Sequence, residues 1–192
     1  MDIERRDIVN KNFYVTTPIY YVNGDPHVGS AYTTIAADVM ARYKRTMGYD
    51  AYFLTGTDEH GQKVEETAKQ KGYTPQQWTD IMAPRFKEMW AKLGIEYSDF
   101  IRTTESRHKE AVKKILKKVY ENGDIYKGEY SGKYCVSCET FVPENQIVNG
   151  NHCPDCGKEL RVVKEESYFF KMSKYQDALL EHIDKHPDFI LP

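Results

Sequence analysis

Two spacings of apolar residues alternate along the first part of the chain. Short β-branched and aromatic runs at residues 12–16 and 51–55 are typical of buried strands. Between them, apolar or small residues recur at helical spacing, and Gly48 supplies a stop. These helical positions are Val28, Tyr32, Ile35, Val39 and Tyr43. The pattern therefore predicts a strand, a helix and a second strand.

A further helix is predicted from Pro75 toward Gly94. Thr74 is a good N-cap, and Pro75 occupies the first helical position, where a missing N–H is tolerated. Pro84 lies inside the same pattern and cannot donate the helical hydrogen bond. It therefore predicts either a kink or a division into two helices.

Residues 99–102 form a candidate third strand, and residues 105–121 form a lysine-rich amphipathic helix that Gly123 closes. The alternation of strands and helices predicts an α/β fold with a parallel sheet over residues 1–123. Beyond residue 123 the composition changes to Gly, Tyr, Cys and Asn with short strands. We therefore expect a second, smaller unit over residues 124–192.

Composition is that of a soluble globular protein, with 40% hydrophobic and 29% charged residues in a chain of 192. No apolar run is long enough to span a membrane, and residues 1–11 lack the apolar segment of a signal peptide, so we expect a cytoplasmic protein without membrane contact. Lys and Arg number 27 against 29 Asp and Glu, which does not indicate nucleic-acid binding. The lysines of residues 105–121 are interpreted as a solvated helix face, with RNA contact as the alternative.

The four cysteines form two C-x-x-C pairs, Cys135 with Cys138 and Cys153 with Cys156. Both pairs occur in turn-forming sequence, where two thiolates can converge on one tetrahedral ion. Two disulfides are the alternative, which a cytosolic compartment disfavours. The spacing therefore predicts one structural zinc ion, with four sulfur ligands and no open position for a catalytic water.

Residues 24–30, GDPHVGS, join the first strand region to the first helix. In open α/β sheets ligands bind at the carboxyl ends of the strands, and a helix N-terminus favours an anion. Gly29 would allow a ligand to approach the backbone closely, and His27 can donate a hydrogen bond to phosphate oxygens. The Asp-Glu-His run at residues 58–60 is expected at the same edge of the sheet. The pattern indicates a phosphate site, with a plain helix start as the alternative.

Several blocks resemble the methionyl-tRNA synthetase family of the class I aminoacyl-tRNA synthetases. They are YVTTPIYYVNGDPHVGSAYTTIAADVMARYKR, FLTGTDEHGQKVEETAKQKG, DFIRTTESRHK, the C-x-x-C knuckle and ESYFFKMSKY. The similarity extends from about residue 12 to residue 192. It implies the N-terminal half of the catalytic region: a Rossmann-like nucleotide-binding fold over residues 1–123 and a zinc-bearing connective insert over residues 124–192, incomplete at its C-terminus.

The resemblance implies roles for the residues that match the family's motifs. Residues 27–30, His-Val-Gly-Ser, fall on the His-Ile-Gly-His signature, so His27, Gly29 and Ser30 would meet the ATP phosphates and nucleotide. Serine at the fourth position departs from the signature: its hydroxyl can donate a hydrogen bond to phosphate but cannot carry positive charge. His27 is therefore expected to contribute more than Ser30.

Three further positions match the family's methionine site. Ile19 and Tyr21 match the side-chain pocket, where an aromatic ring packs on the thioether, and Asp58 matches the carboxylate that holds the α-ammonium group. The resemblance implies ATP-dependent activation of L-methionine to methionyl-adenylate and transfer to tRNA(Met), with Mg²⁺ accompanying ATP. Most tRNA contacts and the returning half of the sheet are expected outside this sequence, so the chain alone should be weakly active or inactive.

Residues 171–174, Lys-Met-Ser-Lys, spell most of the family's second ATP signature, Lys-Met-Ser-Lys-Ser. Tyr175 replaces its last serine, and Ser173 with Gln176 matches a capping box ahead of an apolar helical pattern. We therefore interpret this stretch as the start of a helix in the insert and not as the ATP loop.

Two other functions are compatible with parts of the sequence. A zinc-ribbon RNA-binding module without catalysis would explain the cysteines and the aromatic and basic residues around them. A different nucleotidyl transferase with a His-x-Gly turn would explain residues 27–29. The first predicts RNA binding indifferent to methionine and ATP, and the second predicts a different substrate selectivity.

Overall fold

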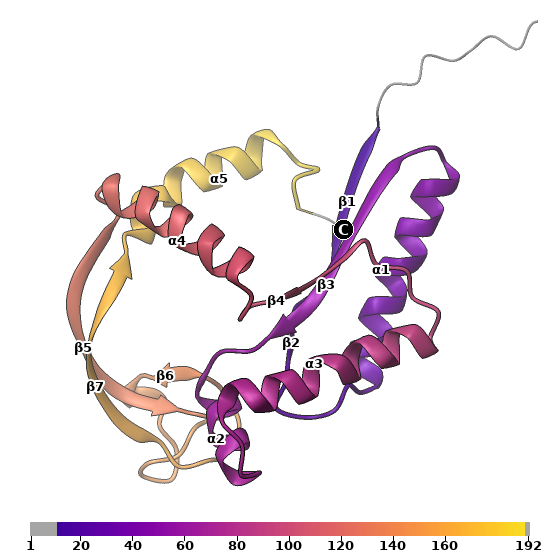
Figure 1. Ribbon diagram of the computed structural model, residues 1–192. Helices are drawn as coiled ribbons and strands as arrows, with labels where there is room; N and C mark the ends of the chain where they lie inside the picture. The colour runs from indigo at the N-terminus through magenta and orange to yellow at the C-terminus, as the bar shows by residue number, and fades with distance from the viewer. Residues whose placement is uncertain (1–10, 191–192) are drawn as a thin grey trace, which may run out of the picture. The chain divides into compact units, whose positions relative to one another are not determined.

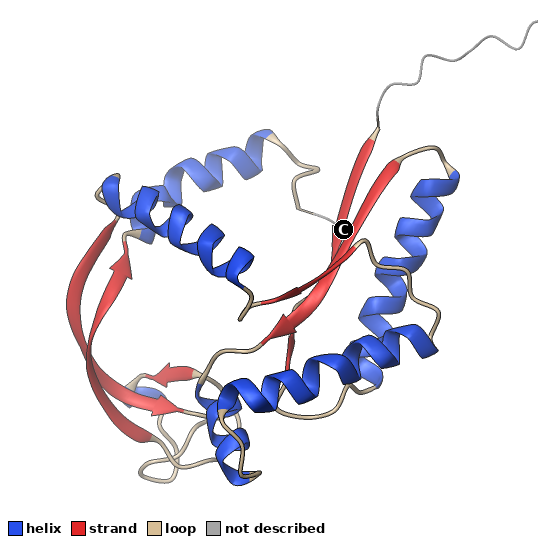
Figure 2. Ribbon diagram, in the orientation of Figure 1, coloured by secondary structure: helices blue, strands red, loops and turns tan. Residues whose placement is uncertain are grey.

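The computed structural model describes residues 11–190 (Figure 1). The chain divides between Glu110 and Ala111 into two compact units. The predicted domain boundary at residue 123 lies just after a helix that spans this division, so the assignment of that helix to the first domain stays a prediction. Each unit contains its own sheet (Figure 2).

The first unit is built on a parallel sheet with β3 as its shared strand. Its strands are β1 (Asn12–Thr16), β2 (Tyr20–Tyr21), β3 (Asp50–Asp58) and β4 (Asp99–Arg102). All three other strands pair with β3, and every pair is parallel. The predicted α/β class with a parallel sheet is therefore confirmed. Strand β3 is longer than predicted and includes Asp58, which the sequence pattern places just past the strand.

Helices lie between these strands along the chain, and the last helix follows β4. They are α1 (Val28–Thr46), α2 (Gln62–Gln70), α3 (Pro75–Lys92) and α4 (Ser106–Glu121). Thr74 closes the predicted capping box on α3 with Gln77. The division of α3 into two helices is wrong: α3 is a single helix through Pro84, held by buried residues on both sides of it, including Met82 and Phe86. Helix α2 was not predicted, since only Val64 and Ala68 are buried in it. Among the helices within residues 11–190, none combines the length and apolarity that a membrane span requires.

Helix α1 packs with its small and partly polar face inward. The apolar positions that predict this helix are exposed in the structure: Val28, Tyr32, Ile35, Val39 and Tyr43. The buried positions are Ser30, Thr34, Ala37, Asp38 and Ala41. Small side chains allow close packing of the helix, and the polar ones are satisfied by hydrogen bonds such as that from Thr34 Oγ1 to the Ser30 carbonyl, 2.8 Å. The existence of the helix follows from the sequence pattern, whereas its buried face does not.

An aromatic core holds the segment between β2 and α1. Tyr20 stacks on Phe86, with ring centroids 5.9 Å apart, and lies beside Trp90. The side chain of Val22 is fully buried, and its carbonyl accepts a hydrogen bond of 2.7 Å from Trp78 Nε1. Helix α3 therefore anchors the chain immediately before residues 24–30.

Gly56 permits the close approach of β3 and β4. A Cβ atom at this position would collide with the carbonyl oxygen of Ile101 and with its side chain. We expect Gly56→Ala to destabilise the chain by about 1–3 kcal/mol, because the paired strands would have to separate. Urea unfolding measures the change. Gly24→Ala is the control, since a Cβ there meets nothing within 4 Å; equal stability of the two variants would contradict the prediction.

The second unit contains an antiparallel sheet in the order β6-β5-β7. Its elements are β5 (Ile125–Cys135), β6 (Thr140–Val142), the 3₁₀ turn η1 (Glu144–Gln146), β7 (Arg161–Phe170), the 3₁₀ turn η2 (Met172–Tyr175) and α5 (Gln176–Lys185). The expectation of short strands is wrong for β5 and β7, which have 11 and 10 residues and pair continuously. Their composition conceals this length because glycines and charged residues interrupt the apolar pattern.

The Lys-Met-Ser-Lys stretch is held by a tertiary contact instead of the predicted capping box. Helix α5 begins at Gln176 with Tyr175 as its N-cap and no side-chain cap hydrogen bond, so the capping box at Ser173 is wrong. Asp124, which is buried, accepts hydrogen bonds from Lys174 Nζ and the Tyr175 hydroxyl. A buried carboxylate requires such donors. Lys174 is therefore engaged in an ion pair within its own unit.

We expect Lys174→Met to lower the thermal unfolding midpoint by a few degrees at pH 7, because Asp124 would keep a buried charge without its cation. The pKa of Asp124 is lowered by Lys174 and then Tyr175, so its ionised form stabilises the fold above about pH 4, and this contribution is lost as pH falls through the lowered pKa. The effect should therefore shrink at acid pH. Lys185→Met, which breaks only an exposed pair with Glu181, is the control; an equal loss in both variants would contradict the prediction.

Candidate functional site

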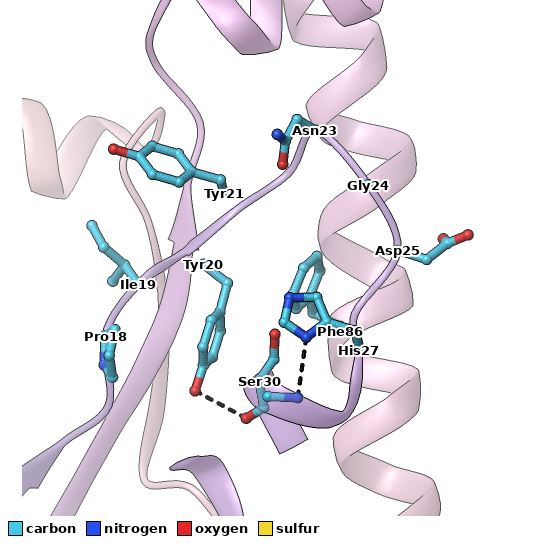
Figure 3. A pocket seen from close by; sticks show the side chains of 11 residues that line it. Pro18, Ile19, Tyr20, Tyr21, Asn23, Gly24, Asp25, His27, Ser30 and Phe86 are labelled. Carbon is cyan, nitrogen blue, oxygen red and sulfur yellow. Dashed lines mark hydrogen bonds between the residues drawn. The ribbon is translucent and has the colours of Figure 1, made fainter. Parts of the chain in front are cut away.

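A cavity of about 460 Å³ lies beside the segment that joins β2 to α1 (Figure 3). Five predicted site residues line it: Ile19, Tyr21, His27, Gly29 and Ser30. Phe86 of α3 and Asp25, which pairs with Arg85 of α3 at 2.6 Å, complete part of the wall. Residues assigned separately to an amino-acid pocket and to a phosphate site therefore share one cavity.

Tyr20 is a site residue that the sequence reasoning missed. It lines the cavity, and its hydroxyl lies 3.2 Å from the Ser30 carbonyl oxygen (Figure 3). The same hydroxyl is hydrogen-bonded to the Thr34 hydroxyl at 2.7 Å. Because adjacent strand residues point to opposite sides, Tyr20 faces α1 while Tyr21 points away from it. The feature of the sequence that could have indicated Tyr20 is its position directly before Tyr21, which was assigned to the pocket. Tyr20 fixes the start of α1 against β2.

His27 is the N-cap of α1. Its Nδ1 accepts a hydrogen bond of 3.1 Å from the Gly29 amide, so the hydrogen of a neutral ring lies on Nε2 (Figure 3). A Cβ atom on Gly29 would lie 3.0 Å from Cε1 and 3.1 Å from Nδ1 of this ring. The sequence suggests that Gly29 makes room for a ligand; the structure shows that it makes room for the His27 ring. The ring is thereby held through Nδ1, and Nε2–H takes no part in this contact.

Ser30 and His27 differ in accessibility. Ser30 is 5% exposed and lies on the buried face of α1, whereas His27 is exposed. The Ser30 carbonyl serves as an acceptor for the hydroxyls of Tyr20 and Thr34. The expected lesser contribution of Ser30 to ligand binding agrees with this burial and stays a prediction.

Asp58 is the last residue of β3 and does not line the cavity. It is paired with Tyr21 in the parallel ladder between β2 and β3. Both strands end here, so the carboxylate and the Tyr21 ring lie at the same edge of the sheet. The Thr103 hydroxyl lies 3.5 Å from Asp58 Oδ1.

The neighbouring Glu59 is part of a buried charge network. Its side chain is fully buried and accepts hydrogen bonds from Thr57 Oγ1 and Arg102 Nε, both at 2.7 Å, and from Thr104 Oγ1. Arg102 also pairs with Asp80 of α3 at 2.6 Å. Glu59, followed by Asp80, raises the pKa of Arg102, and Arg102 lowers the pKa of Asp80. This network joins the ends of β3 and β4 to α3. The sequence analysis did not identify Arg102, because the sequence shows only a charged residue at the end of a predicted strand.

The four cysteines converge as predicted. Their sulfur atoms all lie within 4.8 Å of one another, with 3.4 Å between Cys135 and Cys156 and 3.8 Å between Cys138 and Cys153. A disulfide would need about 2.05 Å, whereas two sulfurs on one tetrahedral zinc ion lie about 3.8 Å apart, given Zn–S bonds of about 2.3 Å. All four cysteines are free thiols. The cluster therefore fits a metal site with four sulfur ligands.

Four neighbouring thiolates would repel one another, and protonation of some of the four cysteines removes this repulsion. Hydrogen bonding with Cys156 raises the pKa of Cys138 to about 12, and the backbone amide of Lys158 lowers the pKa of Cys156 to about 7. Without an ion the sulfurs are thus not all thiolates at neutral pH. Because an ion binds thiolates, its uptake releases protons, and its affinity falls as pH is lowered.

Comparison with known proteins gives a consistent family. The model of the family "tRNA synthetases class I (M)" matches residues 13–189. The methionine–tRNA ligase of Fusobacterium nucleatum is 74% identical over 184 residues, which cover 96% of this chain and 29% of that protein. That of Thermotoga maritima is 54% identical, covering 94% and 29%. Mycobacterium tuberculosis methionyl-tRNA synthetase in complex with methionyl-adenylate is 43% identical with a TM-score of 0.90, covering 95% of this chain and 36% of that one. The chain thus spans less than a third of the curated relatives' length, and it belongs to the class I (M) family of tRNA synthetases.

Proposed function

We propose that this chain supplies the methionine-binding and much of the ATP-binding surface of a methionine–tRNA ligase. The observation that carries the proposal is the shared cavity, which brings His27 and Gly29 together with Ile19 and Tyr21 in a chain 74% identical to such a ligase. The reaction has two steps. The methionine carboxylate attacks the α-phosphate of ATP, giving methionyl-adenylate and pyrophosphate; a ribose hydroxyl of the terminal adenosine of tRNA(Met) then attacks the methionyl carbonyl and releases AMP.

His27 stabilises the charge that develops on the phosphate oxygens. Its ring is fixed by the Gly29 amide, so Nε2–H is available without reorganisation during the step. The amides of the first turn of α1 favour the same anion. Ser30 contributes at most a neutral hydrogen bond, since it carries no charge and is buried.

The amino acid is held at two points. Ile19 and Tyr21 contact the thioether, where an aromatic ring makes a favourable contact with sulfur. Asp58, paired with Tyr21 at the end of the sheet, binds the α-ammonium group. Holding both ends of the substrate places its carboxylate for attack on phosphorus, which supplies much of the rate acceleration of such a transfer.

Zn²⁺ is the ion proposed for Cys135, Cys138, Cys153 and Cys156, because four thiolates in tetrahedral spacing suit it and leave no position for a substrate. Its role is structural. Mg²⁺ would arrive with ATP and bind its phosphates. Further partners are tRNA(Met), contacted largely outside this chain, and the location is the cytoplasm.

The test is methionine-dependent ATP–pyrophosphate exchange. It is measured on the chain alone and on a chimera in which this chain replaces the matching segment of the Fusobacterium nucleatum ligase, with methionine, isoleucine, leucine and cysteine. We expect the chimera to exchange with methionine only and the chain alone to show weak or no exchange. Exchange with another amino acid would overturn the methionine assignment. A folded, zinc-loaded chimera without exchange would overturn the enzyme proposal, and RNA binding indifferent to methionine and ATP would favour the zinc-ribbon module.

A further inference from the structure

Thr103 contacts three consecutive residues at the end of β3. Its hydroxyl accepts a hydrogen bond of 2.8 Å from the Glu59 amide and lies 3.5 Å from Asp58 Oδ1. Its carbonyl oxygen lies 3.3 Å from His60 Nε2. Thr103 is only 5% exposed. A single buried residue that follows β4 thus contacts the whole Asp-Glu-His run.

The number of hydrogens on each group determines which group donates in the contact between the Thr103 hydroxyl and Asp58. A threonine hydroxyl has one hydrogen and can accept through its lone pairs. The Glu59 amide can only donate, so the hydroxyl is an acceptor in that contact. Its own hydrogen remains for the Asp58 carboxylate, which has none when ionised. Thr103 therefore makes a long, weak contact with one carboxylate oxygen, Oδ1, and leaves the other for a cation.

Thr103 is itself held firmly by its surroundings. Its amide donates to the Thr57 carbonyl at 3.2 Å, which extends the ladder between β3 and β4. The residues on both sides of it, Arg102 and Thr104, bind the buried Glu59 carboxylate. The hydroxyl is thereby placed by the sheet and by the charge network together, so it cannot follow Asp58 if that side chain moves.

We propose that Thr103 is a positioning residue that orients the Asp58 carboxylate toward the α-ammonium group of the amino-acid substrate. The inference rests on the proposed function of Asp58. The hydrogen bond selects one orientation of the carboxylate before the substrate binds, and the free oxygen then meets the ammonium group. Because the bond is long in this structure, its removal should weaken methionine binding without abolishing it.

The experiment compares Thr103→Val with Thr103→Ser in the chimera by pyrophosphate exchange. Valine has nearly the shape of threonine but lacks the hydroxyl, so we expect the KM for methionine to rise by up to about tenfold, the upper end of the range for an ordinary hydrogen bond, with the KM for ATP unchanged. Serine retains the hydroxyl and should restore the wild-type KM. Thr104→Val is the matched control: its hydroxyl bonds Glu59 in the same turn, so it should lower stability but leave the ratio of the two KM values unchanged.

A double-mutant cycle tests whether Thr103 acts through Asp58. In an Asp58→Ala background, where the Thr103 hydroxyl has no side-chain acceptor at this position, Thr103→Val should add almost nothing to the KM for methionine. Fully additive effects, or equal changes in the KM for methionine and for ATP, would overturn the proposal. If Thr103→Val does not fold, Thr103→Cys, a weaker donor of similar size, should still raise the KM for methionine, and an unchanged KM would overturn it. Failure of the wild-type chimera to exchange would instead overturn the proposed function.

Discussion

Replacing Cys153 with serine is expected to abolish stoichiometric metal binding and to unfold the loop region around the four cysteines. Cys153 and Cys135 are fully buried, and among the residues that the structure describes their cluster includes only two other buried residues, Val142 and Leu160. So small a core cannot offset the entropy of ordering the surrounding loops. A structural zinc ion contributes about 10–16 kcal/mol in small zinc domains, and loss of one thiolate removes much of this.

Metal content by mass spectrometry and amide hydrogen exchange over residues 135–160 measure both effects. We expect about one zinc ion per chain in the wild type, from one four-thiolate site, and a small fraction of this in Cys153→Ser, with protection lost in this region only. Ser137→Ala changes a residue between two ligands and should retain the metal. The first unit has a separate aromatic core and should keep its protection. Full zinc content in Cys153→Ser, or none in the reconstituted wild type, would refute the zinc assignment.

His27→Ala is expected to lower kcat for pyrophosphate exchange by the chimera about 10²–10³-fold, as removal of one preorganised donor does in comparable sites. In the structure Nδ1 of the histidine caps α1, and in the proposed function Nε2–H is the donor to the phosphate. Loss of the cap alone should cost about 1 kcal/mol of stability. Activity and stability therefore need to be measured on the same samples.

His27→Asn separates the two roles. Asparagine is a good N-cap, so this variant should unfold at nearly the wild-type temperature, yet it lacks a ring nitrogen that extends to the phosphate and should be as inactive as His27→Ala. Gly29→Ala should show an intermediate loss, because its Cβ would displace the ring. If His27→Asn exchanged at the wild-type rate, the histidine would be only a helix cap.

A sequence pattern predicts local geometry, as it did for the cysteine cluster, but not which face of a helix is buried, as α1 shows. The C-x-x-C spacing predicts a four-sulfur site because each pair converges through its own turn, which is local geometry. The spacing along α1 predicts a helix for the same reason. It does not say which face packs, because Ala37 and Ala41 allow a closer approach to the sheet than Tyr32 or Val39 would. Which face of α1 is buried depends on the shape of the sheet surface that the helix packs against.

The second unit gives a similar result. The Lys-Met-Ser-Lys stretch has the local features of a capping box, yet Ser173 makes no cap, and the buried carboxylate of Asp124 determines the conformation instead. A charge removed from water binds its donors more strongly than a hydroxyl binds a helix end. The contact joins residues 50 positions apart, which no local window contains.

The sequence by itself determined three of the four strands of the parallel sheet, β1, β3 and β4, together with the cysteine site and the resemblance that selects His27, Gly29 and Asp58. Each rests on residues close together in the chain, where spacing and hydrogen bonding are set by local geometry. Only the tertiary structure revealed the buried Glu59–Arg102 pair and the contacts of Thr103 with the end of β3, which depend on the register of two strands more than 40 residues apart. That register follows from the packing of the whole unit, because a shift by one residue would turn every one of these side chains to the other face.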